Sequence, residues 1–389
     1  MGPIVLLDKS ALQCLSDDEI GFLGKHYSPM MPPVLLFEIL GDLSKYKGQE
    51  IKFEIAKKIS SGHFEINANH RTICLASLLG EKIEMRGVPV VSGGVQLETS
   101  KGEKGIFRDE PAEWKLVRKW QEGKYTLVDR VISGVWRKIS KEFDMESYVR
   151  KFKKANSDLP KANNFSDMYK AIYGITMEAS SQDFYLNFLM NEFNISPRYR
   201  AYIIARWQRR TNLMLCDFSP YAFYCLNVSL IFHFGLANDL ITPKRTNPID
   251  LEYLYYLPFC MAFVSGDKFQ ADLSKLLLKQ DQDFIDRDAL KSDLKWLKEE
   301  WNSSDKTERE KRFYDYGAYP PQYNSESITY KLWKKHMKPW KPGSGNLKLT
   351  DEQKKRVMEQ MRPMMDAIKK YEQEQAGQTV KNDSERIAD

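Results

Sequence analysis

Two aspartates follow short apolar stretches that are typical of buried strands. Asp8 comes directly after residues 3–7 (PIVLL), and Asp267 lies three residues beyond residues 259–264 (FCMAFV). Each run is long enough for one buried strand of a parallel sheet. Because ligands of open α/β sheets bind outside the carboxyl ends of the strands, both carboxylates are predicted to lie at a ligand-binding edge.

Two further acids lie on predicted helices. Glu38 stands among apolar residues in the segment 32–40 (PPVLLFEIL), where its prolines can open a helix. Burying a carboxylate on an apolar helix face is unfavourable unless the carboxylate is paired or binds a metal. Asp250 falls in the first turn of a helix predicted to begin at the N-cap Asn247, where the helix dipole favours an anion.

The elements that would position these acids are short. Residues 3–7, the segment beginning at Met30 and residues 259–264 are predicted strands. Ser10 is predicted to cap a helix that reaches Leu23, and residues 270–315 are predicted to be helical. Between about residues 62 and 110 we expect a short helix followed by a hairpin, and from about 111 to 235 a helical body.

The order and setting of the four acids resemble the PIN-domain nuclease family. The matching segments are residues 7–10 (LDKS), residues 34–40 (VLLFEIL), Asp250 and residues 265–269 (SGDKF). The resemblance covers roughly the first sixty residues and those from about 215 to 280. The sequence departs from the family pattern at Lys9-Ser10, where the family often has Thr or Ser followed by Asn, and in a long stretch between the second and third acids.

The resemblance implies an α/β fold with a PIN-like, mostly parallel sheet flanked by helices, a large and mainly α-helical insertion, and a helical C-terminal region. The implied boundaries are a discontinuous core at 1–60 and 215–285, an insertion at 61–214, an extension at 286–345, and a C-terminal helix with a polar tail at 346–389.

The resemblance also implies a metal-dependent chemistry. The implied ligands and catalytic residues are Asp8, Glu38, Asp250 and Asp267. Such a cluster suits Mg²⁺ or Mn²⁺, which prefer oxygen ligands and lower the pKa of a bound water so that it can attack a phosphodiester. Ser10 and Ser265 would orient a carboxylate or a water. Taken singly, each aspartate is better explained as a helix cap or turn residue, whereas the four together favour a metal site.

Two basic stretches rich in aromatic residues are candidate nucleic-acid contacts. They are residues 197–212 (PRYRAYIIARWQRRTN) and residues 331–341 (KLWKKHMKPWK), with Arg206, Arg209, Arg210, Lys334 and Lys335 as the predicted contact residues. Arginine and aromatic side chains together suit phosphate contacts and base stacking. The alternatives are a solvated helix face for the first stretch and a packed C-terminal arm for the second. We expect Arg206 and Arg210 to face the acidic edge.

Composition is compatible with this interpretation without requiring it. The chain has 42% hydrophobic and 29% charged residues and a net charge of +6, which permits a nucleic-acid partner. Its five cysteines show no zinc-binding spacing, and their odd number and apolar neighbours favour reduced thiols and a cytoplasmic location. No signal peptide is expected, and residues 221–237 are predicted to form a buried helix and not a membrane span.

Three functions therefore remain open. The preferred one is a divalent-metal-dependent endonuclease, with RNA favoured over DNA as the resemblance implies. The second is a PIN-like scaffold whose acids hold no metal and whose helical insertion binds a protein partner or a second copy of the chain. The third is a helical interaction protein, which requires that the strands predicted at residues 3–7 and 259–264 do not form.

Overall fold

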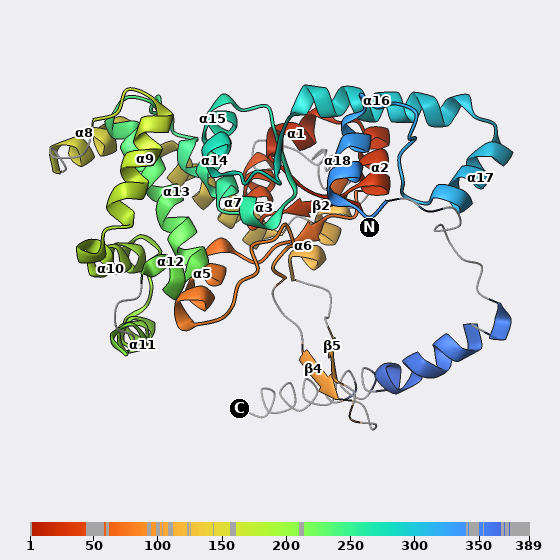
Figure 1. The fold of residues 1–389 in the computed structure, drawn as a ribbon, viewed down its shortest axis with the longest axis horizontal. Coiled ribbons are helices and arrows are strands. Elements are labelled where there is room, and N and C mark those ends of the chain that lie inside the picture. The colour runs from red at the N-terminus through yellow and green to blue at the C-terminus, as the bar shows by residue number, and fades with distance from the viewer. Residues whose placement is uncertain are drawn as a thin grey trace.

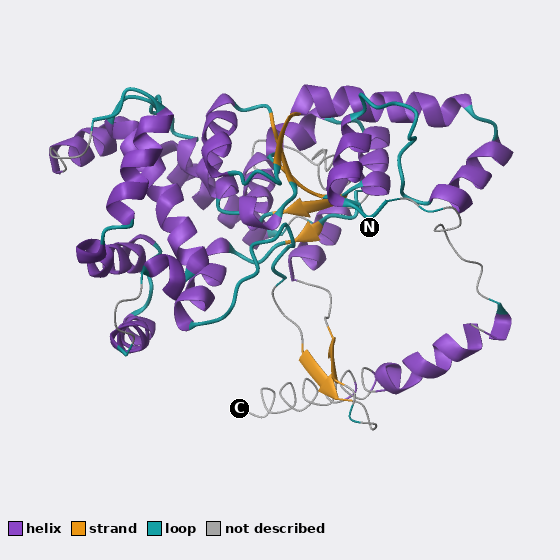
Figure 2. Ribbon diagram, in the orientation of Figure 1, coloured by secondary structure: helices purple, strands orange, loops and turns teal. Residues whose placement is uncertain are grey.

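A five-stranded, all-parallel sheet forms the centre of the protein (Figures 1 and 2). Its strands are β1 (Ile4–Leu7), β2 (Ser28–Met31), β3 (Glu65–Ile66), β6 (Ala262–Ser265) and β7 (Asp283–Asp286). The computed structural model describes residues 2–43, 58–59, 62–91, 95–98, 102, 104–107, 112–122, 124, 126–142, 144–155, 161–209, 214–339, 341, 350–352, 354–366, 369 and 373. The architecture is thus α/β, as predicted.

The strand order β3-β2-β1-β6-β7 places a topological switch point between β1 and β6. From β1 the chain builds the sheet outward through β2 and β3, and it later returns to the other side of β1 to add β6 and β7. Val5 pairs with Ala262 and Leu7 with Val264, so the carboxyl ends of β1 and β6 lie side by side. In open α/β sheets a ligand-binding crevice forms at such a point.

Helices cover both sides of the sheet (Figure 2). The helices of the sheet region are α1 (Lys9–Cys14), α2 (Asp17–His26), α3 (Pro33–Leu43), α14 (Asn247–Leu254), α15 (Lys268–Leu277) and α16 (Arg287–Ser303). α16 packs against α1 and α2, whereas α14 packs against α15 and α3. Leu6, Leu12, Leu35 and Phe263 are fully buried between these layers, which fixes the strand ends in place.

A helical body follows β3 in the sequence. It comprises α5 (His70–Leu79), α6 (Ala112–Gln121), α7 (Leu127–Glu142), α8 (Met145–Ala155), α9 (Phe165–Thr176), α10 (Gln182–Glu192), α11 (Pro197–Gln208), α12 (Leu215–Phe218) and α13 (Pro220–Ala237), with the 3₁₀ turn η1 (Ala179–Ser181). An antiparallel hairpin of β4 (Val95–Glu98) and β5 (Lys104–Phe107) interrupts it, as predicted.

Helix α13 is the core of this body. Within the described residues it is the one helix long and apolar enough to cross a membrane by length and composition, and 78% of that window is buried inside the structure. It packs against α5, α8, α9, α10, α12 and α14. A helix that is apolar all round is expected to be surrounded by protein, so the prediction of a buried helix at residues 221–237 is confirmed.

The C-terminal region begins after α16 with α17 (Lys306–Tyr316) and α18 (Ile328–His336). Helix α18 buries Leu332 and Trp333, and the indole N–H of Trp333 donates to the carbonyl of His26 at 2.7 Å. The second basic stretch is therefore a packed arm over the region where it is described, which was the alternative to a nucleic-acid contact.

Several predicted boundaries are wrong, each for a local reason. Asp8 caps α1 and Ser16 caps α2, so Ser10 caps no helix and two helices replace the predicted one. Thr246, not Asn247, is the N-cap residue of α14. The segment 270–315 is not helical throughout, because β7 lies within it and forms an edge strand of the sheet. The strands β1 and β6 pair in parallel as predicted, which excludes a purely helical interaction protein.

Candidate acidic site at the carboxyl edge of the sheet

Asp8 lies at the switch point, and its carboxylate accepts hydrogen bonds from three residues. The side chain is 4% exposed and accepts hydrogen bonds from the backbone N–H of Ala11 at 2.6 Å, the Ser10 hydroxyl at 2.8 Å and the Ser265 hydroxyl at 2.8 Å. Burial raises the pKa of Asp8 above its usual value, although these hydrogen bonds oppose the shift and the nearby Asp267 adds to it. Asp8 is both a helix cap and a buried acid.

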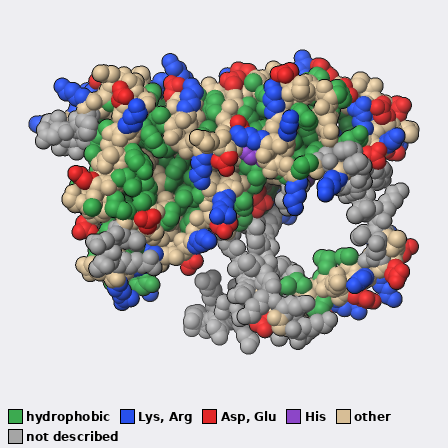
Figure 3. Space-filling view, viewed as in Figure 1, with side chains coloured by type: hydrophobic (Ala, Val, Ile, Leu, Met, Phe, Trp, Pro, Cys, Tyr) green, Lys and Arg blue, Asp and Glu red, His purple; other side chains and the backbone are tan. Residues whose placement is uncertain are grey.

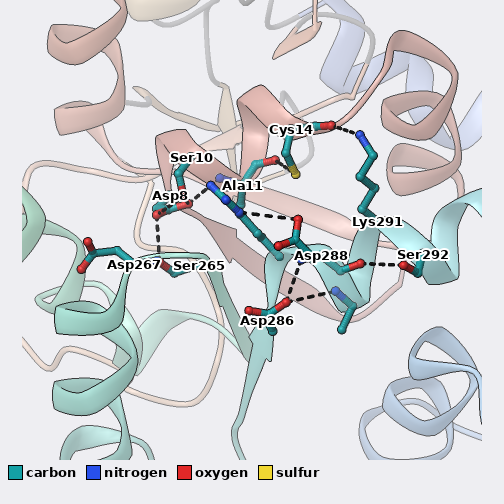
Figure 4. A network of polar contacts seen from close by, with 12 residues as sticks. Asp8, Ser10, Ala11, Cys14, Ser265, Asp267, Asp286, Asp288, Lys291 and Ser292 are labelled. Carbon is teal, nitrogen blue, oxygen red and sulfur yellow. Dashed lines mark hydrogen bonds and ion pairs between the residues drawn. The ribbon is translucent and has the colours of Figure 1, made fainter.

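Ser265, the last residue of β6, connects Asp8 to the next strand end. Its hydroxyl oxygen accepts from the backbone N–H of Asp267 at 2.9 Å and lies 2.7 Å from Oε1 of Gln270. Because a hydroxyl has one hydrogen, Ser265 donates either to Asp8 or to Gln270 at any moment. Asp267 itself caps α15 through the N–H of Gln270 at 3.0 Å. Two neighbouring strands thus end in aspartates that share one serine (Figure 4).

Glu38 reaches the same edge from α3. The Tyr253 hydroxyl of α14 donates to Glu38 Oε2 at 2.5 Å, and Lys9 Nζ lies 4.0 Å from Glu38 Oε1 and 2.6 Å from Asp42 Oδ2. Burial raises the pKa of Glu38, with further increases from Asp8 and Asp42, while Tyr253 and Lys9 act in the opposite direction. The apolar setting of this acid in the sequence therefore corresponds to real desolvation.

Asp250 has the most perturbed carboxyl group of the set. Burial is the largest cause and Asp267 the second, and Glu38 and Asp8 also contribute, so its pKa is raised to about 7. We expected the first turn of α14 to favour the anion, but burial and three neighbouring carboxylates outweigh that effect. Since each of the four acids affects the pKa of another, the structure brings together the four acids that the sequence singled out.

The side chains are arranged for hydrogen bonding and not for metal ligation. Within the described part of the chain, no group of three or more His, Cys, Asp or Glu side chains has the geometry to hold one ion. The donor chemistry still fits a hard cation, because every candidate ligand is a carboxylate oxygen. Binding a metal at this edge would therefore require the carboxylates to turn from their present hydrogen-bond partners.

Sequence reasoning missed two residues at the same edge. Asp286 ends β7, the strand beside β6, and caps α16 through the N–H groups of Asp288 and Ala289 (Figure 4). Arg287 follows it, and a Cβ placed on Gly266 would overlap its Cδ and Nε atoms, so its side chain crosses the turn between Ser265 and Asp267. Arg287 Nε is buried without a hydrogen-bond partner in the described residues, and Asp288 lies 3.7 Å away.

The signal for both residues was available in the sequence. Residues 283–286 (DFID) repeat the pattern of an apolar run followed by an acid, but the run has only two apolar residues. Gly266 has no Cβ, which indicates a close approach by another group without identifying that group.

The predicted nucleic-acid contacts have mixed outcomes. Arg206 donates to the carbonyl oxygens of Leu78 at 2.9 Å and Phe218 at 3.4 Å, and its guanidinium lies 4.0 Å from the centre of the Phe218 ring. Its role is therefore structural, and it does not present a free guanidinium to the acidic edge. Lys335 pairs with Asp283 at 2.8 Å.

The remaining predicted contact residues are Arg209, Lys334 and Arg210. Arg209 and Lys334 are exposed, and Arg210 lies outside the described residues. On the face shown in Figure 3, Lys and Arg side chains alternate with Asp and Glu and form no continuous basic track. On this face, a nucleic-acid partner would thus meet separate basic side chains and no broad basic surface.

No family model, curated protein or solved structure matches this chain.

Proposed function

We propose that the protein is a divalent-metal-dependent endonuclease with a PIN-like core, acting on RNA in preference to DNA. The observation that carries the proposal is the convergence of four electrostatically coupled carboxylates at the topological switch point of a parallel sheet. Keeping several acids together in a half-buried setting is unfavourable, and a bound cation would offset that repulsion. The preference for RNA comes from the resemblance of the sequence segments to the PIN-domain family.

Each part of the edge has a task in this proposal. Mg²⁺ or Mn²⁺, when bound, would supply an activated water and stabilise charge on the leaving oxygen. Asp8, Glu38, Asp250 and Asp267 provide the oxygen ligands, and Ser10 and Ser265 hold Asp8 in place. Asp250 must lose the proton that its raised pKa retains near neutrality.

Arg287 completes the edge with a positive charge. Its side chain crosses Gly266 between two of the strand ends. Its buried Nε has no hydrogen-bond partner among the described residues and lies 3.7 Å from Asp288. A phosphodiester approaching four carboxylates is repelled, and a guanidinium can bind the phosphate oxygens in their place. We assign Arg287 to substrate phosphate binding in this proposed reaction.

Cleavage of a labelled single-stranded RNA tests the proposal. The wild type should cleave with Mn²⁺ or Mg²⁺ and stop when EDTA is added. Asp8→Asn keeps an oxygen that can accept from Ala11 N–H but removes the charge, so it should fold normally and lose cleavage. Asp239→Asn is the matched control, because Asp239 is exposed and pairs with Lys153 on the helical body. Equal cleavage by Asp8→Asn and the wild type would refute the assignment.

One observation favours the scaffold alternative. Helix α7, which lies in the predicted insertion, packs on α3 through the Ser133 hydroxyl, which donates to Leu40 O at 2.7 Å, and through Trp136, which stacks on Phe37. Its other face carries five exposed aliphatic residues at helical spacing, namely Leu127, Val128, Val131, Ile132 and Val135. Such a stripe is typical of an interaction surface.

A second copy of the chain is the partner to test first for this alternative, because most soluble oligomers are homo-oligomers. Sedimentation velocity should then show a dimer that Val131→Glu converts to a monomer. A monomeric wild type would count against this candidate function.

A further inference from the structure

A cleft near the amino edge of the sheet, away from the acidic site at the carboxyl edge, has the features of a small-molecule site. Its volume is about 580 Å³, and its lining residues come from the C-terminal half of α2, the end of α16, α17 and the segment that follows α17. Lys25, which lines it, lies three residues before β2 begins, at the amino edge of the sheet, whereas Asp8 lies at the carboxyl edge. Clefts of this size accommodate drug-sized ligands, and this one is separate from the acidic site.

Five aromatic side chains line the cleft. Phe22 comes from α2, Trp301 from α16, and Tyr316, Tyr319 and Tyr323 from α17 and the segment after it. Tyr319 is held against Trp333 with ring centres 4.4 Å apart, and Tyr323 packs edge-on against Trp296 at 6.1 Å. Walls of this kind favour a flat ring, which can stack or meet a ring edge with little loss of side-chain entropy.

Lys25 is the polar group that distinguishes the cleft. Its Nζ lies 3.2 Å from the centre of the Trp301 ring and 5.7 Å from that of Phe22, and no carboxylate of the described residues lies within ion-pair distance of it. Burial and the charge of Arg312 lower the pKa of Lys25 to about 8. The ammonium group is therefore partly desolvated and lies close to a second positive charge, so an anion bound to it would be favourable.

Among the other charged residues that line the cleft, Arg312 pairs with Glu300 and Glu308, whereas the exposed Lys311 has no ion pair with a described carboxylate. Arg312 donates to Glu300 at 2.9 Å and to Glu308 at 2.8 Å, so it contributes repulsion at Lys25 without being available as a bidentate partner. Lys298 lines a neighbouring cleft of about 560 Å³, which meets the first one at Phe22, Lys25 and Trp301, and it is bonded to Asp18 at 2.6 Å. Lys25 thus stands at the junction of the two clefts as a partly buried lysine that pairs with no carboxylate of the described residues.

We infer that this cleft binds a planar aromatic monoanion, such as an aromatic carboxylate, with its ring between Trp301 and the tyrosines and its charge on Lys25. One ring system and one negative group satisfy both the aromatic walls and the unpaired ammonium. A nucleic-acid strand fits less well, because Asp17, Asp18, Glu300, Glu308 and Asp315 also line the two clefts. The inference is independent of the nuclease proposal.

Calorimetric titration with 2-naphthoate tests the inference, with 2-naphthylmethylammonium as the probe of opposite charge. The wild type should bind one naphthoate per chain and prefer it to the ammonium compound. Lys25→Met keeps the length and apolar contacts of the side chain but removes the charge, so it should weaken naphthoate binding by about tenfold or more, as expected for a desolvated ion pair. Trp301→Leu should weaken the binding of both compounds.

Lys298→Met is the matched control, because it removes a lysine that already has a carboxylate partner. It should leave naphthoate affinity unchanged, and the melting temperature of each variant should show that it is folded. Absence of naphthoate binding by the wild type would overturn the inference. Equal affinity of Lys25→Met and the wild type, or equal weakening by Lys298→Met, would overturn it as well.

Discussion

Replacing Asp250 by Asn should stabilise the metal-free protein in a strongly pH-dependent way. The pKa of Asp250 is raised to about 7, first by burial and then by Asp267, Glu38 and Asp8. In the unfolded chain the same carboxyl group ionises near its ordinary value of 3.8. The folded protein therefore holds a proton between these two values that the unfolded chain has released, and stability falls as pH rises through this window.

The size of the effect follows from the shift. Each pKa unit corresponds to about 1.4 kcal/mol, so raising pH from about 5 to above 7 removes roughly two units, or about 2–3 kcal/mol, of the stability that protonated Asp250 provides. Asparagine is neutral at every pH and lacks this loss. The gain in unfolding free energy of Asp250→Asn over the wild type should thus be about 2–3 kcal/mol larger near pH 8 than near pH 5.

Urea titration followed by tryptophan fluorescence, in EDTA at both pH values, measures this difference. Asp239→Asn serves as the control, because Asp239 is exposed and its replacement leaves the acidic edge untouched. A gain for Asp250→Asn that is the same at both pH values would refute the reasoning, since it would show that Asp250 is not forced to ionise against burial and neighbouring carboxylates.

Three further predictions concern residues around the edge and the helical body. Gly266→Ala should displace the Arg287 side chain. Its affinity for single-stranded RNA in EDTA should therefore fall to that of Arg287→Ala. Unchanged affinity in both variants would exclude a phosphate contact. Arg206→Met should lower the unfolding free energy by about 1–3 kcal/mol through lost buried hydrogen bonds while RNA affinity stays the same, and a selective loss of affinity would restore it as a nucleic-acid contact. Tyr253→Phe removes the hydroxyl that donates to Glu38, which should lower the unfolding free energy by about 1–3 kcal/mol in urea titrations. This loss should be larger near pH 8 than near pH 5, because the hydrogen bond favours the ionised form of Glu38. The reverse order would show that Glu38 stays neutral.

The parts of the fold that sequence could predict are those with a strong local pattern. The apolar run ending at Leu7 forms a strand buried except at Ile4, and the run ending at Val264 forms a fully buried strand. Because parallel strands end at a common edge, Asp8 and Asp267 were expected together. Glu38 was identified by its apolar neighbours, and its burial follows from the same pattern.

The remaining features depend on tertiary contacts. β7 is a half-exposed edge strand with only Phe284 and Ile285 as apolar residues. Because charged residues surround this short apolar pair, the sequence pattern predicted a helix there. Arg206 looked like a free basic residue because sequence does not show that the carbonyl of Leu78 lies beside it. Likewise, the raised pKa of Asp250 arises from acids that are distant in sequence and meet only in the folded chain.

Titration of the purified protein with Mn²⁺, followed by the loss of the free-ion paramagnetic resonance signal, tests the central claim most directly. The wild type should bind Mn²⁺ at the acidic edge, and binding should tighten as pH rises through about 7 because Asp250 must release its proton. Asp8→Asn and Asp267→Asn should each lose this binding, whereas Asp239→Asn should keep it. Absence of Mn²⁺ binding by the wild type, or equal binding by Asp8→Asn and Asp267→Asn, would contradict the assignment of the four carboxylates to a metal-dependent nuclease site.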